Sequence, residues 1–363
     1  LKFIFRKSCL KRNWREVLAF ETNNYDFRSV FMKKITVIIF VFLIFLFFIT
    51  GCENNNEQNI IKDNKLVIAE QYGLAYAPVQ LIKESNLLQQ ANPDLKIEWK
   101  QLSNTAAIRE SMLAGEVDIA FMAIPPFLIA RDKGMSWKII SGLSQSPLGL
   151  MVNRDYINSI SDFKKSDKIA LPQPGSIQHI LLSMAAEKEF GDPKIFDNQL
   201  LTMKHPDAMN ALLSGKEVAA HFASPPYLFL ESREEGIKKV LSGKEAFGGE
   251  YTFIIGVSTE EFYQNEKQKY RIFKNSLNQA LKKFNQSPES TAEILADNYD
   301  LKVKEMREYL SWPGMKYTSE IKGLKNFISF MKKQGYITNE NYKETDLVFT
   351  ESGNLKEADN NEE

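Results

Sequence analysis

The chain has very few cysteines and histidines. Its 363 residues include two cysteines, Cys9 and Cys52, and three histidines. Because no cysteine follows Cys52, no disulfide can form in that part of the chain, and an apolar core has to hold it together. Scattered histidines without a neighbouring thiol give no metal-site pattern. We therefore expect neither a metal nor another cofactor.

Common enzyme motifs and a basic surface are also missing. The chain has no HExxH, GxSxG or P-loop pattern and no evident pair of nucleophile and base. Its 46 basic and 46 acidic residues balance, but nine of the bases and only three of the acids precede Cys52, which leaves a net charge of about −6 from there on. A mildly acidic chain is not typical of nucleic-acid binding. We expect neither an enzyme nor a nucleic-acid-binding protein.

An uncharged apolar run at 35–49 follows Lys33 and Lys34 and precedes Thr50-Gly51-Cys52. This is the pattern of a secretory signal peptide. The run is shorter than the ~20 residues that a membrane-spanning helix prefers, although a retained membrane anchor is the alternative. The expected segments are 1–31, upstream of the true start; 32–51, the signal peptide; 52–64, a polar tether; and 346–363, a flexible tail.

Apolar runs that predict strands alternate from residue 65 with stretches at helical spacing. The expected strands are 65–70, 95–99, 117–122, 137–141, 168–171, 199–203, 218–222 and 239–241. The expected helices between them are 78–89, 104–113, 126–133, 176–190, 206–213 and 226–232, and 260–286, 289–298, 302–310 and 319–334 follow. This order predicts an α/β fold whose sheets are mostly parallel.

One segment of the chain occurs in two similar copies. Residues 112–128 read MLAGEVDIAFMAIPPFL and residues 212–228 read LLSGKEVAAHFASPPYL, with seven of the seventeen positions identical. Solenoid arrays need at least three repeats, so two copies favour two similar lobes. We expect lobe one to comprise 65–150 and 252–345 and lobe two to comprise 151–251. The extended runs 148–153 and 251–258 would cross between them as a two-strand hinge.

Five stretches carry a resemblance to a known family. They are ITGC (49–52), AEQYGLAYAPVQL (69–81), NTAAIRESMLAGEVDIAFMAIPP (104–126), LPQPGSIQHILL (171–182) and GLKNFISFMKKQGYI (323–337). Together they resemble the substrate-binding lipoproteins of ABC importers in the nitrate, taurine and aliphatic-sulfonate class, which includes binders of thiamine-pyrimidine precursors. The resemblance covers nearly all of residues 65–340.

The resemblance implies a two-lobed periplasmic-binding-protein fold of type II. It also implies cleavage before Cys52, acylation of that residue and anchoring on the extracytoplasmic face of the cell membrane. The protein would act as a monomer that captures a small organic solute between its lobes and delivers it to an ABC permease and its ATPase. The alternative is a sensory or adhesive lipoprotein that uses the same fold without transport. A related pyrimidine-forming synthase relies on active-site histidine and cysteine, and the part of this chain expected to fold has no cysteine.

Ligands of open parallel sheets bind beyond the carboxyl ends of the strands, where free N–H groups of helix starts favour anions. The loops expected there hold no Arg or Lys, so neutral donors would bind an anion, and a neutral heterocycle fits equally well. Ser176 is a plain helix cap or a solute contact, Tyr76 is a core residue or a ring partner, and the Pro-Pro pairs can simply end strands. We expect His179 to be structural. The predicted ligand-binding residues are Gln71, Tyr72, Tyr76, Asn104, Thr105, Ile124, Pro125, Ser144, Gln145, Gly175, Ser176, Ser224 and Tyr251.

Overall fold

The computed structural model describes residues 64–339 and 342–350. These residues belong to one compact unit. Cys52, the apolar run at 35–49 and most of the expected tail lie outside the described residues. Within the described part, no helix combines the length and the hydropathy that crossing a membrane requires.

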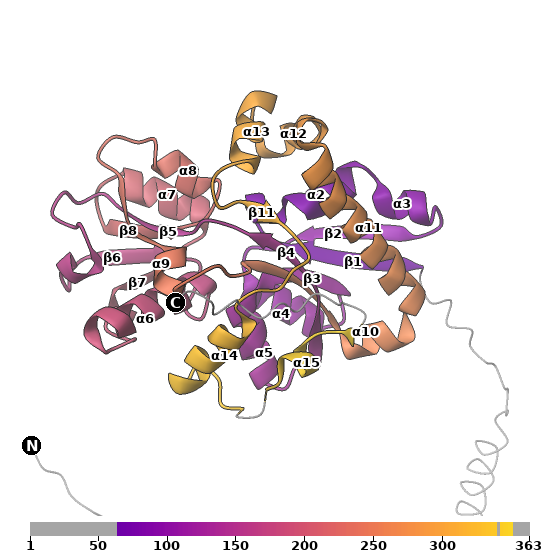
Figure 1. The fold of residues 1–363 in the computed structure, drawn as a ribbon, viewed down its shortest axis with the longest axis horizontal. Helices are drawn as coiled ribbons and strands as arrows, with labels where there is room; N and C mark the ends of the chain where they lie inside the picture. The colour runs from indigo at the N-terminus through magenta and orange to yellow at the C-terminus, as the bar shows by residue number, and fades with distance from the viewer. Residues whose placement is uncertain (1–63, 340–341, 351–363) are drawn as a thin grey trace, which may run out of the picture. The chain divides into compact units, whose positions relative to one another are not determined.

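Two sheets organise the described residues (Figure 1). The sheet of lobe one contains β1 (Lys65–Glu70), β2 (Lys96–Gln101), β3 (Ile119–Ala123), β4 (Trp137–Gln145), β10 (Ile254–Thr259) and β11 (Lys316–Tyr317). Its strand order is β11-β4-β10-β3-β1-β2. β1 pairs in parallel with β2 and β3, whereas β10 runs antiparallel between β3 and β4.

The sheet of lobe two has the same plan. It contains β5 (Gly149–Val152), β6 (Lys168–Leu171), β7 (Leu200–Thr202), β8 (Val218–Ala223) and β9 (Lys238–Ser242), in the order β7-β6-β8-β5-β9. β6 pairs in parallel with β7 and β8, and β5 runs antiparallel between β8 and β9. In both sheets the strand that follows a crossing between the lobes, β10 or β5, thus runs antiparallel to both of its neighbours. Lobe one has β11 as a further antiparallel strand at its edge. The boundary expected between residues 150 and 151 falls inside β5.

Helices cover both sheets. Lobe one has η1 (Leu74–Tyr76), α2 (Ala77–Glu84), α3 (Leu87–Ala91), α4 (Thr105–Leu113) and α5 (Ile124–Asp132); lobe two has α6 (Ile177–Phe190), α7 (His205–Leu213), α8 (Tyr227–Glu231) and α9 (Gly243–Phe247). The later helices are α10 (Glu260–Asn265), α11 (Lys267–Gln286), α12 (Pro288–Leu295), α13 (Val303–Leu310), α14 (Leu324–Lys333) and α15 (Glu344–Leu347). α11 packs on α2 and α3, and α14 packs on α5, so this segment mainly completes lobe one.

The α/β class and the strand pattern predicted from the sequence are confirmed, but three expected helices are wrong in their extent. The helix expected at 78–89 breaks after Glu84, because Asn86 adopts a left-handed conformation with φ of 50°. The helix expected at 260–286 divides at Glu266 into α10 and α11. The helix expected from residue 319 begins only at Leu324, after Gly323 with φ of 77°.

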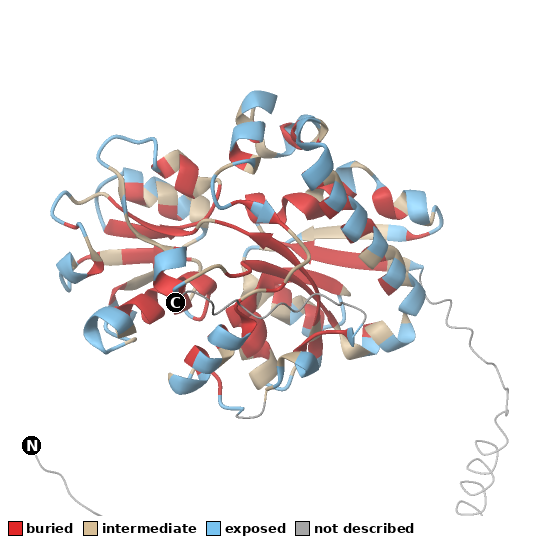
Figure 2. Ribbon diagram, viewed as in Figure 1, coloured by how far each residue is buried: buried red, intermediate tan, exposed pale blue. Residues whose placement is uncertain are grey.

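The core follows the strands. β1, β3, β4, β5, β8 and β10 are buried along almost their whole length, and the exposed residues gather on the outer sides of the helices (Figure 2). Strands that are covered on both faces read as continuous apolar runs, which is why the sequence of these strands was recognisable. This buried framework holds the loops at the strand ends in fixed positions.

Candidate ligand-binding site

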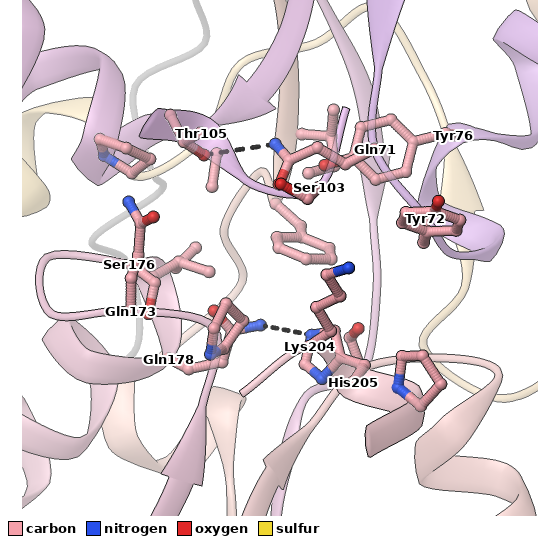
Figure 3. A pocket seen from close by; sticks show the side chains of 18 residues that line it. Gln71, Tyr72, Tyr76, Ser103, Thr105, Gln173, Ser176, Gln178, Lys204 and His205 are labelled. Carbon is pink, nitrogen blue, oxygen red and sulfur yellow. Dashed lines mark hydrogen bonds between the residues drawn. The ribbon is translucent and has the colours of Figure 1, made fainter. Parts of the chain in front are cut away.

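A cavity lies where loops of the two lobes meet (Figure 3). Lobe one contributes the ends of β1, β2, β3 and β10, and lobe two contributes the ends of β6, β7 and β8. The lining residues are Gln71, Tyr72, Tyr76, Ser103, Thr105, Ala123, Pro126, Pro172, Gln173, Ser176, Ile177, Gln178, Lys204, His205, Pro206, Ser224, Phe253 and Ile254. The cavity encloses about 60 Å³, well below the ~300–1,000 Å³ of common small-molecule pockets.

Six of the predicted ligand-binding residues line this cavity. They are Gln71, Tyr72, Tyr76, Thr105, Ser176 and Ser224. Gln71 donates a hydrogen bond from Nε2 to the Thr105 hydroxyl at 3.2 Å. Ser176 is the N-cap of α6, and its hydroxyl accepts a hydrogen bond from the N–H of His179 at 3.4 Å. Loops from both lobes therefore bring hydroxyl and amide groups to one place.

The other predicted residues lie outside the lining. Asn104 caps α4 by accepting the N–H of Ala107 at 3.0 Å. Gln145 borders a different surface cavity, near Lys316 and Tyr317. Ile124, Pro125, Ser144 and Tyr251 are buried, and Gly175 donates its N–H to Nδ1 of His179 at 2.9 Å.

Twelve of the eighteen lining residues were not among the predicted ligand-binding residues, and two of them, Lys204 and Gln178, matter most for the chemistry of the cavity. Lys204 corrects the expectation that the loops hold no cation: it precedes α7 and its side chain extends from the lobe-two side of the cavity toward Gln71 and Tyr72 (Figure 3). Gln178 lies in the first turn of α6, where it reads as an ordinary helix residue. The position of Lys204 directly before a helix start was a usable signal, because cavity loops of this kind end where helices begin.

The lobes touch on several sides of the cavity. The N–H of Leu74 donates to the carbonyl of Pro225 at 3.2 Å. On a second side, Phe229 of α8 stacks on Trp312, with ring centroids 4.1 Å apart. On a third, the hydroxyls of Ser183 in α6 and Tyr336 lie 2.9 Å apart. These contacts hold the two lobes together beside the cavity.

A row of polar side chains leads away from the cavity into lobe two. Nε2 of Gln178 lies 3.2 Å from Nε2 of His205, and Nδ1 of His205 lies 2.8 Å from Nε2 of His221. Nδ1 of His221 lies 2.5 Å from Oε1 of Glu231. Burial lowers the pKa of His221 to about 3 and raises the pKa of Glu231 to about 9. Burial, with His221 close by, also lowers the pKa of His205.

A second cavity of about 280 Å³ adjoins the first within lobe one. It shares Gln71 and Tyr76 with the first cavity and contains the carboxyl group of Glu70. Burial raises the pKa of Glu70 to about 8, although the nearby Lys83 opposes this. Oε2 of Glu70 has no hydrogen-bond partner among the described residues. Burial thus favours the neutral form of this carboxyl group.

No arrangement for metal binding accompanies either cavity. Nowhere in residues 64–339 and 342–350 do three or more His, Cys, Asp or Glu side chains gather in a way that could hold a metal ion. The chemistry that the first cavity offers is thus hydrogen bonding from hydroxyls, amides and one ammonium group, between aromatic and proline surfaces.

Comparison with known proteins identifies the relatives of this chain. The sequence profile of the family described as NMT1/THI5 like matches residues 89–291. A search of curated protein sequences gave no significant match.

Solved structures share the fold. The alkanesulfonate-binding protein SsuA from Xanthomonas axonopodis pv. citri, bound to MOPS, is 18% identical and has a TM-score of 0.65, with 81% of this chain and 99% of that chain covered. The periplasmic aliphatic sulphonate binding protein SsuA from Escherichia coli is 18% identical with a TM-score of 0.62, covering 79% and 92%. The periplasmic nitrate-binding protein NrtA from Synechocystis PCC 6803 is 12% identical with a TM-score of 0.61, covering 77% and 83%. The two-lobed binding-protein fold is thereby confirmed.

Proposed function

Because the chain belongs to the NMT1/THI5-like family, we propose that it is the solute receptor of an ABC importer. The observation that carries this proposal is the cavity lined from both lobes at the carboxyl ends of their parallel strands. An enzyme would need reacting groups at this place, whereas a receptor needs only complementary polar and apolar surfaces. Hydroxyls, amides and rings from two separable lobes meet the second requirement.

The receptor works by closing on its solute. A solute that contacts both lobes binds the closed form more tightly than the open form, and this difference alone shifts the equilibrium. Contacts such as Leu74 with Pro225 and Phe229 with Trp312 stabilise the closed arrangement in which these groups meet. The closed lobes present matched faces to a permease, which releases the solute when it parts them.

Lys204 favours a solute with an anionic or strongly electron-rich group. Its ammonium group shares the cavity with the hydroxyls of Thr105 and Ser176, and both belong to helix starts where N–H groups favour negative charge. The similar proteins named for sulfonates and nitrate bind anions, which agrees with this preference. Tyr72 and Tyr76 leave room for an organic or aromatic part of the solute.

The direct test is a Ser176→Trp substitution. Ser176 lies in the cavity and is 7% exposed, so an indole there fills the space that the solute needs. Calorimetric titration of the wild type with nitrate, taurine, alkanesulfonates and pyrimidines should identify a binder, and the variant should lose that binding while keeping its far-UV spectrum. Ser214→Trp, at an exposed position after α7, is the matched control. Unchanged affinity in the Ser176 variant would refute this placement of the site.

Membrane attachment is a separate part of the proposal. We propose that Cys52 is acylated after signal cleavage and holds the receptor, as a monomer, on the extracytoplasmic face near the permease and its ATPase. Several acyl chains give stable anchoring where one chain does not. A Cys52→Ala variant should therefore move from the membrane fraction to the soluble fraction after cell lysis. Retention of the variant in the membrane fraction would argue for a spanning anchor instead.

A further inference from the structure

The row of side chains behind the cavity forms one continuous hydrogen-bonded chain. It runs from Gln178 through His205 and His221 to Glu231, with successive atoms 3.2, 2.8 and 2.5 Å apart. Gln178 and His205 line the cavity at one end. At the other end His221 and Glu231 are fully buried, each with 0% exposure. Oε2 of Glu231 has no hydrogen-bond partner among the described residues.

Each link of this chain can point in either of two directions. A neutral imidazole carries one N–H, so it donates on one side and accepts on the other. The primary amide of Gln178 donates through its nitrogen and accepts through its oxygen, and half a turn of the amide exchanges the two. Reversing one link therefore reverses them all, and the chain has only two fully bonded states.

The two states differ by one proton at the buried end. In the outward state Glu231 and His221 together are neutral: Nε2–H of His221 donates to His205, and Nε2–H of His205 donates to the oxygen of Gln178. This holds whether the proton in the 2.5 Å contact lies on the carboxyl group or on Nδ1 of His221. In the inward state Glu231 is a carboxylate, both histidines carry Nδ1–H, and the nitrogen of Gln178 donates to His205. The structure draws the Gln178 amide in this orientation, with its nitrogen toward His205, and the outward state differs from it by half a turn of the amide.

The outward state avoids an uncompensated buried charge. The inward state places a full negative charge on a carboxylate with no cation against it, and such a charge is costly. Burial is the sole cause of the raised pKa of Glu231. Near the cavity end, Lys204 precedes His205, Asp207 follows it in the first turn of α7, and the ring of Tyr227 stacks on His205 at 5.6 Å. Tyr227 belongs to the same short helix as Glu231, and no charged group contributes to the raised pKa of Glu231.

We propose that this row of hydrogen bonds decides whether Gln178 presents a donor or an acceptor to the binding cavity. In the outward state Gln178 turns its amide N–H₂ toward the solute and binds an acceptor group on it. Gln178 is the contact residue, and His205, His221 and Glu231 are positioning residues. The acceptor that fits is an oxygen of a sulfonate, nitrate, carboxylate or carbonyl group. This inference rests on the proposed receptor function and deepens it, because it names a contact and the part of the solute that the contact recognises.

The donor orientation of Gln178 should be lost at high pH. When the pH rises above the pKa of Glu231, the pair loses its shared proton, the chain reverses and Gln178 shows its carbonyl oxygen to the cavity. An acceptor group on the solute is then repelled. In the neutral and mildly acidic range the pair stays neutral, so the donor end persists there.

The tautomers of the histidines test the proposal without any solute. The whole protein has three histidines, so ¹⁵N-histidine labelling and long-range ¹H–¹⁵N spectroscopy give few signals. His179 serves as an internal reference, because its Nδ1 accepts the N–H of Gly175 and its proton must be on Nε2, 3.1 Å from Asp197. At pH 7 we expect His205 and His221 to carry their protons on Nε2 as well. Both should change to Nδ1–H at alkaline pH in the wild type, where Glu231 loses its proton.

Two variants show that the chain acts as a unit. His221→Phe keeps a buried ring but cuts the connection, so His205 should lose the alkaline transition. Glu231→Gln removes the titrating group and should also leave the His205 tautomer unchanged up to pH 10. His205 carrying Nδ1–H in the wild type at pH 7 would overturn the proposal. The same alkaline transition of His205 with and without His221 would overturn it too. Neither outcome depends on whether the protein binds a solute, so failure here is distinguishable from failure of the receptor function.

Discussion

The two copies of the repeated unit occupy equivalent places in the two lobes, but the side chains buried at the middle of their strands differ. β3 and β8 each lie between a parallel strand and the antiparallel strand of their sheet. Gly115 and Gly215 end the preceding helices with φ of 70° and 68°. At the middle of the strand, however, lobe one has Phe121 and lobe two has His221.

This difference separates scaffold from function. The positions that both copies share are Leu, Gly, Ala and Pro, which fix the helix end, the strand packing and the following turn. The positions that differ determine whether the strand only packs in the core or also links to the cavity through hydrogen bonds. In lobe one, Phe121 packs against Phe273, with centroids 6.0 Å apart. In lobe two, His221 links Glu231 to His205 at the cavity.

The largest effect should come from exchanging the middle residue of lobe one. Phe121→His puts an imidazole without a built partner into a fully buried position, and we expect a loss of about 3–5 kcal/mol in the free energy of unfolding. The reciprocal His221→Phe removes a partner of Glu231 and should cost about 1–3 kcal/mol. Urea denaturation of both variants measures the difference. A smaller loss for Phe121→His than for His221→Phe would mean that the two strands tolerate polarity alike.

The next effect compares a buried carboxyl group of lobe one with an exposed one of lobe two. The pKa of Glu70 is raised to about 8, above its value in the unfolded chain. Between pH 4.5 and 8 the unfolded chain therefore binds fewer protons than the folded one, and stability falls as pH rises through this window. Glu70→Gln removes this cost and should stabilise the protein at pH 8 by on the order of 3 kcal/mol, with little effect at pH 4.5.

Thermal unfolding at the two pH values measures this gain. Glu234→Gln, at an exposed site of lobe two, is the control and should change stability little at either pH. Equal behaviour of Glu70→Gln and the control would show that Glu70 is ionised in the folded protein.

A third, smaller effect concerns glycines of positive φ. Gly175 of lobe two has φ of 80°, and a Cβ there would lie 2.8 Å from Cδ1 of Ile129 in lobe one. Gly115 has φ of 70° with no atom within 4 Å of such a Cβ. Both alanine variants should lose about 1–2 kcal/mol of stability through backbone strain. Gly175→Ala should lose slightly more, because Cδ1 of Ile129, the end of a flexible side chain, also has to move. Thermal unfolding measures both losses, and a larger loss for Gly115→Ala would contradict this order.

The smallest effect compares two helix caps. Asn104 caps α4 outside the cavity lining, and Ser176 caps α6 within it. Each alanine variant should cost about 1 kcal/mol of stability. Ser176→Ala should also weaken binding of the solute identified by calorimetry, whereas Asn104→Ala should leave the affinity unchanged. A loss of affinity in Asn104→Ala would place that residue at the site after all.

Local sequence patterns were enough to predict the main strands and several helix starts. β1 and β6 have the expected bounds because each is an apolar run between polar residues, and the sequence NT at 104–105 correctly marks the start of α4. The loops at the strand ends also led to Gln71, Thr105, Ser176 and Ser224, which line the cavity. Asn86 breaks the expected helix at 78–89 through a backbone conformation that helical spacing does not reveal.

The α/β class, the pairing of similar lobes and the loops that face the cavity follow from the amino-acid sequence, since these depend on periodicity and on residues adjacent in the chain. Which side chains meet at the cavity depends on the three-dimensional packing. His205, His221 and Glu231 are 16 and 10 residues apart and belong to α7, β8 and α8. Their contact depends on the register of the sheet and the packing of its helices, and no local pattern records either.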